Sequence, residues 1–217
     1  MLHDDHHISH FQSPFLYVLH HPGGLLYNNN LNLTAGTYTF HSPKFGDNAY
    51  IAQNDGTKIL EAIAGGNGGT MSSGSDGGSG GGGGAMYYSY DTTSYGFEFG
   101  GNGVLGQGSN GHQGMRAQYY GGGGGGASGI GVADNHGVQA GVAGLDLSDF
   151  VGINTGVLAK GGNGSGFTSW NDSSHSGATG SAGADSTGNG GNAGLTNNGG
   201  GRGGSGIIYL IIPRILE

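Results

Sequence analysis

The chain has 217 residues, of which 55 are glycine, and it carries a formal charge of −8 with only six Lys and Arg and no Cys. The lack of cysteine excludes disulfides and thiolate metal or redox sites, and the scattered basic residues argue against a nucleic-acid partner. No apolar stretch approaches the ~20 residues of a membrane-spanning helix, so we expect no membrane insertion.

Histidine is concentrated at the N-terminal end, where six of the ten histidines lie within the first 21 residues, beside Asp4 and Asp5. Neighbouring His and Asp side chains can bind a divalent metal, and the weak candidates for such ligands are His3, His6, His7 and His10. The alternative is a polar arm whose histidines are solvated or hydrogen-bonded. We expect the second arrangement, and hence no metal and no cofactor.

The first 64 residues predict β-strands and turns. Residues 31–40 alternate apolar and polar residues and are rich in Thr and aromatics, as is typical of a strand. Residues 49–52 and 58–63 flank Asn54-Asp55-Gly56, a turn signal, and therefore predict a hairpin. The sequence His21-Pro22-Gly23-Gly24 predicts a further turn, between strands at 15–19 and 25–27.

The tail carries a continuous apolar run from Ile207 to Ile212, followed by Pro213. Such a run requires burial on both faces. We expect it either to pair with the N-terminal strands, closing the glycine-rich region, or to add to the sheet of a neighbouring subunit. The candidate assembly residues are Phe15, Leu16, Tyr17, Val18, Ile207, Ile208, Leu210 and Ile211.

The middle of the chain, residues 65–206, holds 50 of the glycines, few charged residues and no proline. Disordered segments are usually rich in charge and proline, so we expect an ordered structure. Glycine recurs at every third residue, for example at positions 108, 111 and 114. Three residues per turn is the repeat of an extended left-handed helix without internal hydrogen bonds. Its amides must bond to neighbours, which predicts a bundle of polyglycine II helices.

Islands rich in aromatic residues interrupt the glycine and recur as loops between successive helices would. Loops on a rigid scaffold commonly carry recognition, although the same aromatics could simply cover the ends of the bundle. The candidate receptor-binding residues are Tyr87, Tyr88, Tyr90, Tyr95, Arg116, Tyr119, Tyr120, Trp170 and Asn171.

Catalytic motifs are not evident. The segment 201–206 matches the dinucleotide pattern G-x-G-x-x-G, but a glycine-rich chain produces this pattern by chance, and here it precedes a strand instead of following one. The acidic residues are dispersed without a paired arrangement, and no phosphate loop or zinc-protease motif occurs. We therefore expect a protein that is not an enzyme.

The order of these parts resembles a known family. A strand-rich start, the runs Gly80–Gly84 and Gly121–Gly126, the phrase Gly103–Gly111 and a closing Gly-Arg-Gly-Gly-Ser-Gly-Ile-Ile are similar to glycine-rich virion and tail-fibre proteins of bacteriophages. These include the tail-fibre tip adhesins of T-even-like phages. The resemblance implies a polyglycine II sandwich whose loops contact a host receptor, and no enzymatic activity. Residues 1–30 match no fibre-attachment segment of that family.

The sequence thus predicts a mainly β and irregular fold in three parts. These are a β-rich arm and assembly region (1–64), a polyglycine II bundle with aromatic loops (65–206) and a C-terminal strand (207–217). The expected function is that of an extracellular structural or adhesive protein, on a phage or virion fibre, that binds a host surface protein or glycan. Its further partners would be copies of itself or a fibre shaft protein. The alternative is a self-assembling subunit of an extracellular filament held by strand exchange at the termini.

Overall fold

The fold was analysed in a computed structural model. It describes residues 4–8, 15–21, 24–31, 33–42, 46–70, 72–84, 98–114, 121–127, 140–151, 154–164, 189, 192, 201 and 207–211. These residues form small antiparallel sheets and glycine-rich irregular stretches. The one helix among them is α1 (Ser148–Val151), a single turn. The mainly β and irregular character predicted from the sequence is therefore confirmed for this part of the chain.

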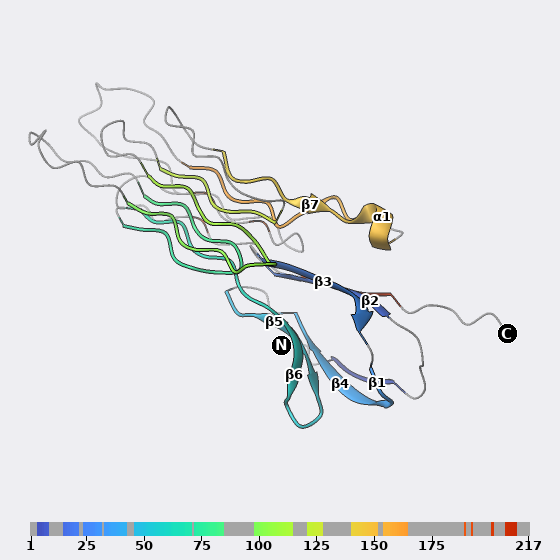
Figure 1. The fold of residues 1–217 in the computed structure, drawn as a ribbon. Helices are drawn as coiled ribbons and strands as arrows, with labels where there is room; N and C mark the ends of the chain where they lie inside the picture. The colour runs from blue at the N-terminus through green and yellow to red at the C-terminus, as the bar shows by residue number, and fades with distance from the viewer. Residues whose placement is uncertain are drawn as a thin grey trace, which may run out of the picture.

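Strands from both ends of the chain build two antiparallel sheets (Figure 1). The four-stranded sheet has the order β1 (Asp4–Ile8), β4 (Gly36–His41), β5 (Ala49–Gln53) and β6 (Lys58–Ala62). The three-stranded sheet has the order β3 (Gly24–Leu31), β2 (Phe15–His21) and β9 (Ile207–Ile211). A short pair, β7 (Leu145–Asp146) and β8 (Val157–Leu158), encloses α1.

Both hairpins expected near the N-terminus are confirmed, because β2 pairs with β3 and β5 pairs with β6 in antiparallel register. At the second turn Gly56 has φ +85° and donates its N–H to Gln53 O at 2.9 Å. Hydrogen bonds from Thr57 lower the pKa of Asp55 in the same turn. The expected single strand over 31–40 is wrong, since Leu31 ends β3 and a new strand begins only at Gly36.

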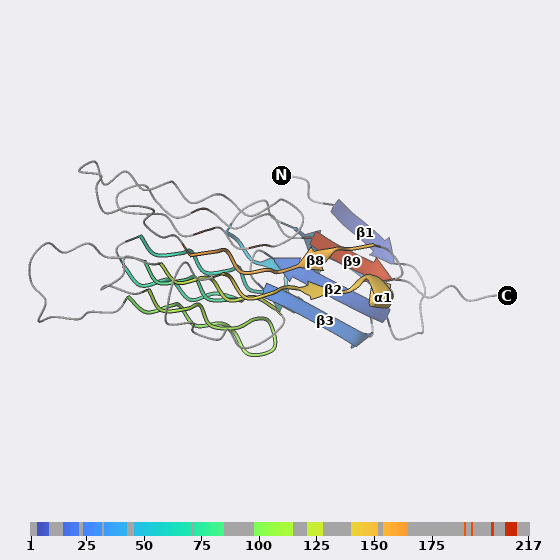
Figure 2. The same cartoon turned by 90° about the horizontal axis from the view of Figure 1, so that it is seen from above.

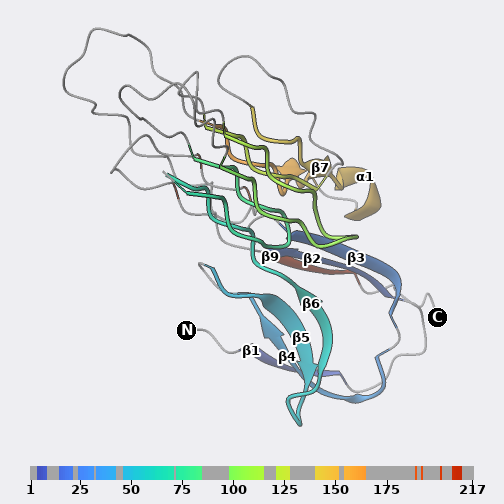
Figure 3. The same cartoon turned by 60° about the vertical axis from the view of Figure 1, so that its left-hand side comes forward.

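The three-stranded sheet is the middle layer of this end of the molecule (Figure 3). On one face a core of Leu31, Leu33, Tyr38, Ala49, Ile51 and Ala62 joins it to the four-stranded sheet, with Leu26 and Ile208 packed alongside. On the other face a second core of Leu25, Leu147, Leu158 and Ala159 includes the partly buried Tyr209. Successive strand residues point to opposite faces, so β9 contributes Ile208 to one core and Tyr209 to the other.

The glycine-rich region crosses back and forth in extended stretches, each of which we call a pass (Figure 2). The described passes are 63–69, 72–78, 79–84, 98–103, 108–114, 121–127, 140–144 and 159–164. Backbone hydrogen bonds between passes recur every three residues. Gly66 N donates to Ser79 O and Gly69 N donates to Gly82 O, both at 2.8 Å. Main-chain hydrogen bonds, with few buried side chains, therefore hold this region together.

The pass 79–84 lies at the centre, and every one of its residues is buried. It is hydrogen-bonded through its backbone to the passes 63–69, 72–78, 98–103, 108–114 and 121–127. A pass with neighbours on all sides has no outward position for a side chain. A Cβ on Gly80, Gly82 or Gly83 would come within 3.0 Å of a neighbouring backbone oxygen, closer than real Cβ atoms approach. Uninterrupted glycine is therefore the signature of an inner pass.

Ser79 is the one residue of this central pass that carries a side chain. It is 2% exposed, and its hydroxyl has no hydrogen-bond partner among the described residues. Because a buried, unsatisfied hydroxyl is destabilising, we expect Ser79→Ala to raise the free energy of unfolding by about 1 kcal/mol, measured by urea denaturation. The matched control is Ser73→Ala, whose Oγ accepts a hydrogen bond from Phe99 N at 3.2 Å. A loss of stability in Ser79→Ala as large as in the control would contradict this prediction.

Candidate functional site

The ends of several passes lie together, away from the two sheets (Figure 1). We call this end the distal rim, formed by Thr70, Ser72, Gly84, Glu98, Gly114, Gly121 and Gly164. Gly84 N donates to Ser72 O at 3.0 Å and Gly114 N donates to Glu98 O at 2.8 Å. A Cβ on Gly164 would collide with Gly121 O, and one on Gly114 with Gly84 O. A Cβ on Gly84 would also collide with Thr70 O, and Gly122 N donates to Gly83 O, so the rim residues lie side by side.

The rim also carries an exposed aromatic side chain. Phe99 is 66% exposed, and its backbone bonds in both directions to the neighbouring pass. Phe99 N donates to Ser73 Oγ at 3.2 Å, and Gly74 N donates to Phe99 O at 2.8 Å. The Ser73 hydroxyl in turn donates to Glu98 Oε2 at 3.3 Å. These bonds fix the backbone that carries the exposed ring, next in the chain to the Glu98 carboxylate.

The predicted receptor-binding residues lie outside the described residues, in the segments 85–97, 115–120 and 165–188. Their described neighbours in the chain nevertheless have definite positions. Gly84 and Glu98 flank the first segment, Gly114 and Gly121 flank the second, and Gly164 precedes the third. All five flanking residues belong to the distal rim. The first two segments are therefore tethered at this end by both flanks, and the third begins there. Asn189, which follows the third segment, lies beside Lys160, whose N–H donates to Asn189 Oδ1 at 2.9 Å.

A further segment with few glycines, residues 145–151, has a different position from the segments 85–97, 115–120 and 165–188. It forms β7 and α1, and Leu147 within it is 2% exposed in the core beneath the passes. Asp146 Oδ1 accepts hydrogen bonds from Ser148 Oγ at 2.6 Å and from Ser148 N at 2.9 Å, which lower the pKa of Asp146. This island is a packing element at the opposite end from the rim.

The candidate assembly residues lie in β2 and β9, which pair with each other within one chain. The register joins Leu16 to Ile211 and Tyr17 to Leu210. Of the histidines considered as metal ligands, His6 and His7 lie in β1, whereas His3 and His10 are outside the described residues. Within the described part of the chain no three His, Asp or Glu side chains gather in a metal-binding group.

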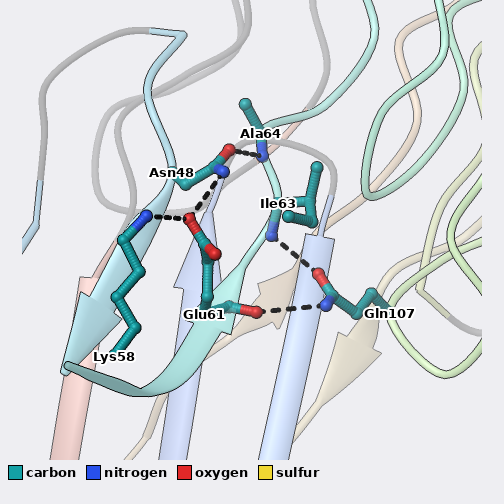
Figure 4. A network of polar contacts seen from close by, with 6 residues as sticks. All are labelled: Asn48, Lys58, Glu61, Ile63, Ala64 and Gln107. Carbon is teal, nitrogen blue, oxygen red and sulfur yellow. Dashed lines mark hydrogen bonds and ion pairs between the residues drawn. The ribbon is translucent and has the colours of Figure 1, made fainter. Parts of the chain in front are cut away.

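Gln107 joins the passes to the sheets at the end opposite the rim, a role that no local sequence pattern indicates (Figure 4). Its side-chain Oε1 accepts from Ile63 N at 2.7 Å, and its Nε2 donates to Glu61 O at 3.1 Å. Its backbone oxygen accepts from Leu25 N at 2.8 Å. One residue thus hydrogen-bonds to the edge of β6 and to β3. The preceding Gly106, with φ +84°, forms the turn that brings it there.

Replacing Gln107 with Ala should lower the free energy of unfolding by about 1–3 kcal/mol, because two partly buried backbone groups lose their partners. Gln107→Glu should be no better, since a carboxylate cannot donate to Glu61 O and adds a charge beside it. Thermal and urea unfolding would measure both variants. The matched control is Gln53→Ala, at an exposed position, for which we expect less than about 0.5 kcal/mol. Equal effects at positions 107 and 53 would contradict the role of Gln107.

Asn48 and Glu61 complete the same junction. Asn48 Oδ1 accepts from Ala64 N at 2.9 Å, and its Nδ2 donates to Glu61 Oε1 at 2.8 Å. Lys58 also pairs with Glu61 Oε1, because a bulge leaves Ile59 unpaired and turns Lys58 to the face of Glu61. Hydrogen bonds from Lys58 and then Asn48 lower the pKa of Glu61 below its ordinary value near 4.5.

The lowered pKa of Glu61 predicts an acid-dependent contribution to stability. A carboxylate with a depressed folded-state pKa stabilises the fold above its unfolded value and loses that effect as the pH falls through the folded value. At pH 7 the free energy of unfolding of the wild type should therefore exceed that of Glu61→Gln. The difference should be no more than about 1 kcal/mol, because the Lys58–Glu61 pair lies near the surface. This difference should shrink below pH ~4 and in high salt. Urea denaturation at several pH values measures this difference. A difference that grows as the pH falls would contradict the stabilising role of the Glu61 carboxylate.

Comparisons with protein-family models, with curated proteins and with solved structures find no match to this chain. A search of the described residues for a helix long and apolar enough to cross a bilayer finds none. The resemblance to phage fibre proteins accordingly stays a prediction. The geometry of the distal rim and of the junction is the basis on which a function is proposed.

Proposed function

We propose that this protein is a non-enzymatic extracellular adhesive protein, a phage or virion fibre component, that binds a host cell-surface protein or glycan at its distal rim. The observation that carries the proposal is that both flanks of 85–97 and of 115–120, and the residue before 165–188, lie together at one end. These segments hold six of the eleven tyrosines and the single Trp of the chain. Such side chains combine large contact areas with hydrogen-bonding groups and are common in recognition surfaces.

We propose further that the passes are polyglycine II helices. Two features support this geometry. The hydrogen bonds between passes step by three residues on both partners, as in Gly122 N to Gly83 O and Gly125 N to Gly80 O. The glycines at these contacts leave no room for a Cβ. Extended helices with three residues per turn and no internal hydrogen bonds would satisfy both features. Such a bundle would hold the rim at a fixed distance from the sheets.

The C-terminal strand would close this scaffold. The pairing of β9 with β2 supports closure, because the chain that follows the glycine-rich region comes back to the sheet that precedes it. Tyr209 of β9 also packs in the core that contains Leu158 and Ala159, beside the start of the pass 159–164. The same pairing uses the segments that strand exchange would require, so an adhesive role is preferred to a filament subunit.

Cell binding by labelled protein tests the adhesive function. Variants would replace Tyr87, Tyr88 and Tyr90, or Tyr119 and Tyr120, or Trp170 with Ala. The matched control is Leu105→Ala, because Leu105 is 99% exposed and belongs to the turn at the opposite end. On a panel of bacterial cells we expect the rim variants to lose on the order of tenfold in binding and the control to lose none. Binding unaffected by all three rim variants would contradict the proposal.

A further inference from the structure

The two larger sheets have four edge strands, and they are treated differently. The edges are β1 and β6 in the four-stranded sheet and β3 and β9 in the three-stranded sheet. An edge strand exposes unpaired N–H and C=O groups that can pair with another chain. Native proteins protect such edges by covering them or by placing charged residues in them. The protection of each edge can therefore be compared.

Gln107 covers two of the four edges. Its side-chain amide bonds to Glu61 O and Ile63 N, groups that a neighbouring strand would otherwise occupy beside β6. Its backbone oxygen bonds to Leu25 N at the beginning of β3. One turn of the glycine-rich region thus occupies the end of β6 and the beginning of β3, where an added strand would pair.

The other side carries β1 and β9 (Figure 2). The sequence of β1, Asp4 to Ile8, contains two Asp and two His, which disfavour pairing with an apolar strand. The sequence of β9, Ile-Ile-Tyr-Leu-Ile, contains no charged residue and no proline. Among the residues that the structure describes, no strand pairs with the outer edge of β9. Among the described edge strands, it is the one with neither a described cap nor a charged, Asn or His residue.

We propose that the outer edge of β9 pairs with β9 of a second copy of this chain. An added strand continues the sheet between the two cores, so both of its faces must be apolar. β9 itself has this property, because Ile208 lies on one core and Tyr209 on the other. Among the described strands of five or more residues, β9 itself has this composition. Two copies related by a twofold axis bring identical strands together in antiparallel pairing, and such an interface is closed. The assembly is a dimer and does not grow into a filament.

The dimer has a consequence for adhesion that rests on the proposed function. β9 runs along the direction of the passes (Figure 2). Antiparallel pairing therefore directs the passes of the two copies, and their distal rims, to opposite ends. A dimer with rims at both ends can bridge two surfaces, so it agglutinates cells that the monomer only coats.

Light scattering and cysteine cross-linking test the interface without any receptor. The wild-type mass should rise with concentration from 21.5 kDa towards twice that value. Since the chain has no cysteine, single Cys substitutions at Ile208, Tyr209 and Leu210 report directly on strand contact. At least one should oxidise to a covalent dimer on the order of tenfold faster than Leu105→Cys, the fully exposed control.

A charge at the edge should reverse the association. Ile211→Lys should stay at the monomer mass, whereas Val157→Lys, at a 50% exposed strand position elsewhere, should dimerise like wild type. Circular dichroism checks that both variants are folded, and if Ile211→Lys is not, the cysteine series decides. A constant 21.5 kDa mass for wild type, or cross-linking no faster than at Leu105, would overturn the dimer. Loss of the dimer with cell binding retained would leave the adhesive function standing.

Discussion

Gly125→Ala is expected to destabilise the protein by about 3 kcal/mol or more, because the new methyl group would meet backbone that cannot move aside. A Cβ on Gly125 would fall within 3.0 Å of Ser109 O, and Gly125 N is itself bonded to Gly80 O at 2.8 Å. Relieving the collision would separate two passes and break the hydrogen bonds between them.

The matched control for this change is its neighbour in the same six-glycine run. A Cβ on Gly124 would lie no closer than 3.2 Å to any atom, the nearest being Gly162 N. Gly124→Ala should therefore change the free energy of unfolding by less than about 1 kcal/mol. The lower conformational entropy of the unfolded chain with Ala partly offsets the cost of the closer contact. Urea denaturation of both variants measures the contrast. Equal losses at the two positions would mean that backbone contact between passes does not determine stability.

Leu158→Ala should lower the free energy of unfolding by about 2–5 kcal/mol, the range for removing a large buried side chain. Leu158 is 0% exposed and belongs to the core that joins the three-stranded sheet to the passes. The adjacent Val157 is 50% exposed, so Val157→Ala should cost less than about 0.5 kcal/mol. Thermal and urea unfolding would compare the free energies of unfolding of the two variants. A large effect at Val157, or none at Leu158, would show that this core does not connect the two parts.

The hairpins were predictable because their signals are local. Asn54-Asp55-Gly56 specifies a turn wherever it occurs, and the flanking residues alternate as a half-buried hairpin requires. The strand over 31–40 failed for a reason that is not local. Leu31, Leu33 and Tyr38 all belong to one core, but Tyr38 follows Leu33 by five residues, so the alternation changes phase where the chain passes from one sheet to the other. Periodicity reports which side is buried, but it does not report which sheet the strand belongs to.

The glycine pattern was informative in part. The three-residue period correctly indicated contacts between extended stretches, since Gly108, Gly111 and Gly114 each leave no room for a Cβ. The unbroken run at 80–84 marks the pass with neighbours on all sides, but its composition alone does not indicate that position. How many neighbours a pass has depends on the order in which passes stack, and no local pattern encodes that order.

The candidate site was predictable only as a set of segments. Aromatic islands at 85–97, 115–120 and 165–188 were separable from glycine by composition, but their tethering at one rim follows from an arrangement of the passes in space. Gln107 was not predictable, because its role depends on contacts with Glu61, Ile63 and Leu25, each of them distant in the sequence. A single amide in a glycine-rich turn gives no local sign of such contacts.

Amide hydrogen exchange, followed residue by residue by NMR, tests most directly whether hydrogen bonds between passes hold the molecule together. Amides exchange slowly only where a stable hydrogen bond must open first. The N–H groups of Gly80 and Gly83 bond to the pass 108–114 and that of Gly81 bonds to the pass 72–78. All three should exchange as slowly as those of the central strand β5. Exchange of these glycines at the rate of an unstructured chain, while β5 stays protected, would contradict the backbone-bonded bundle.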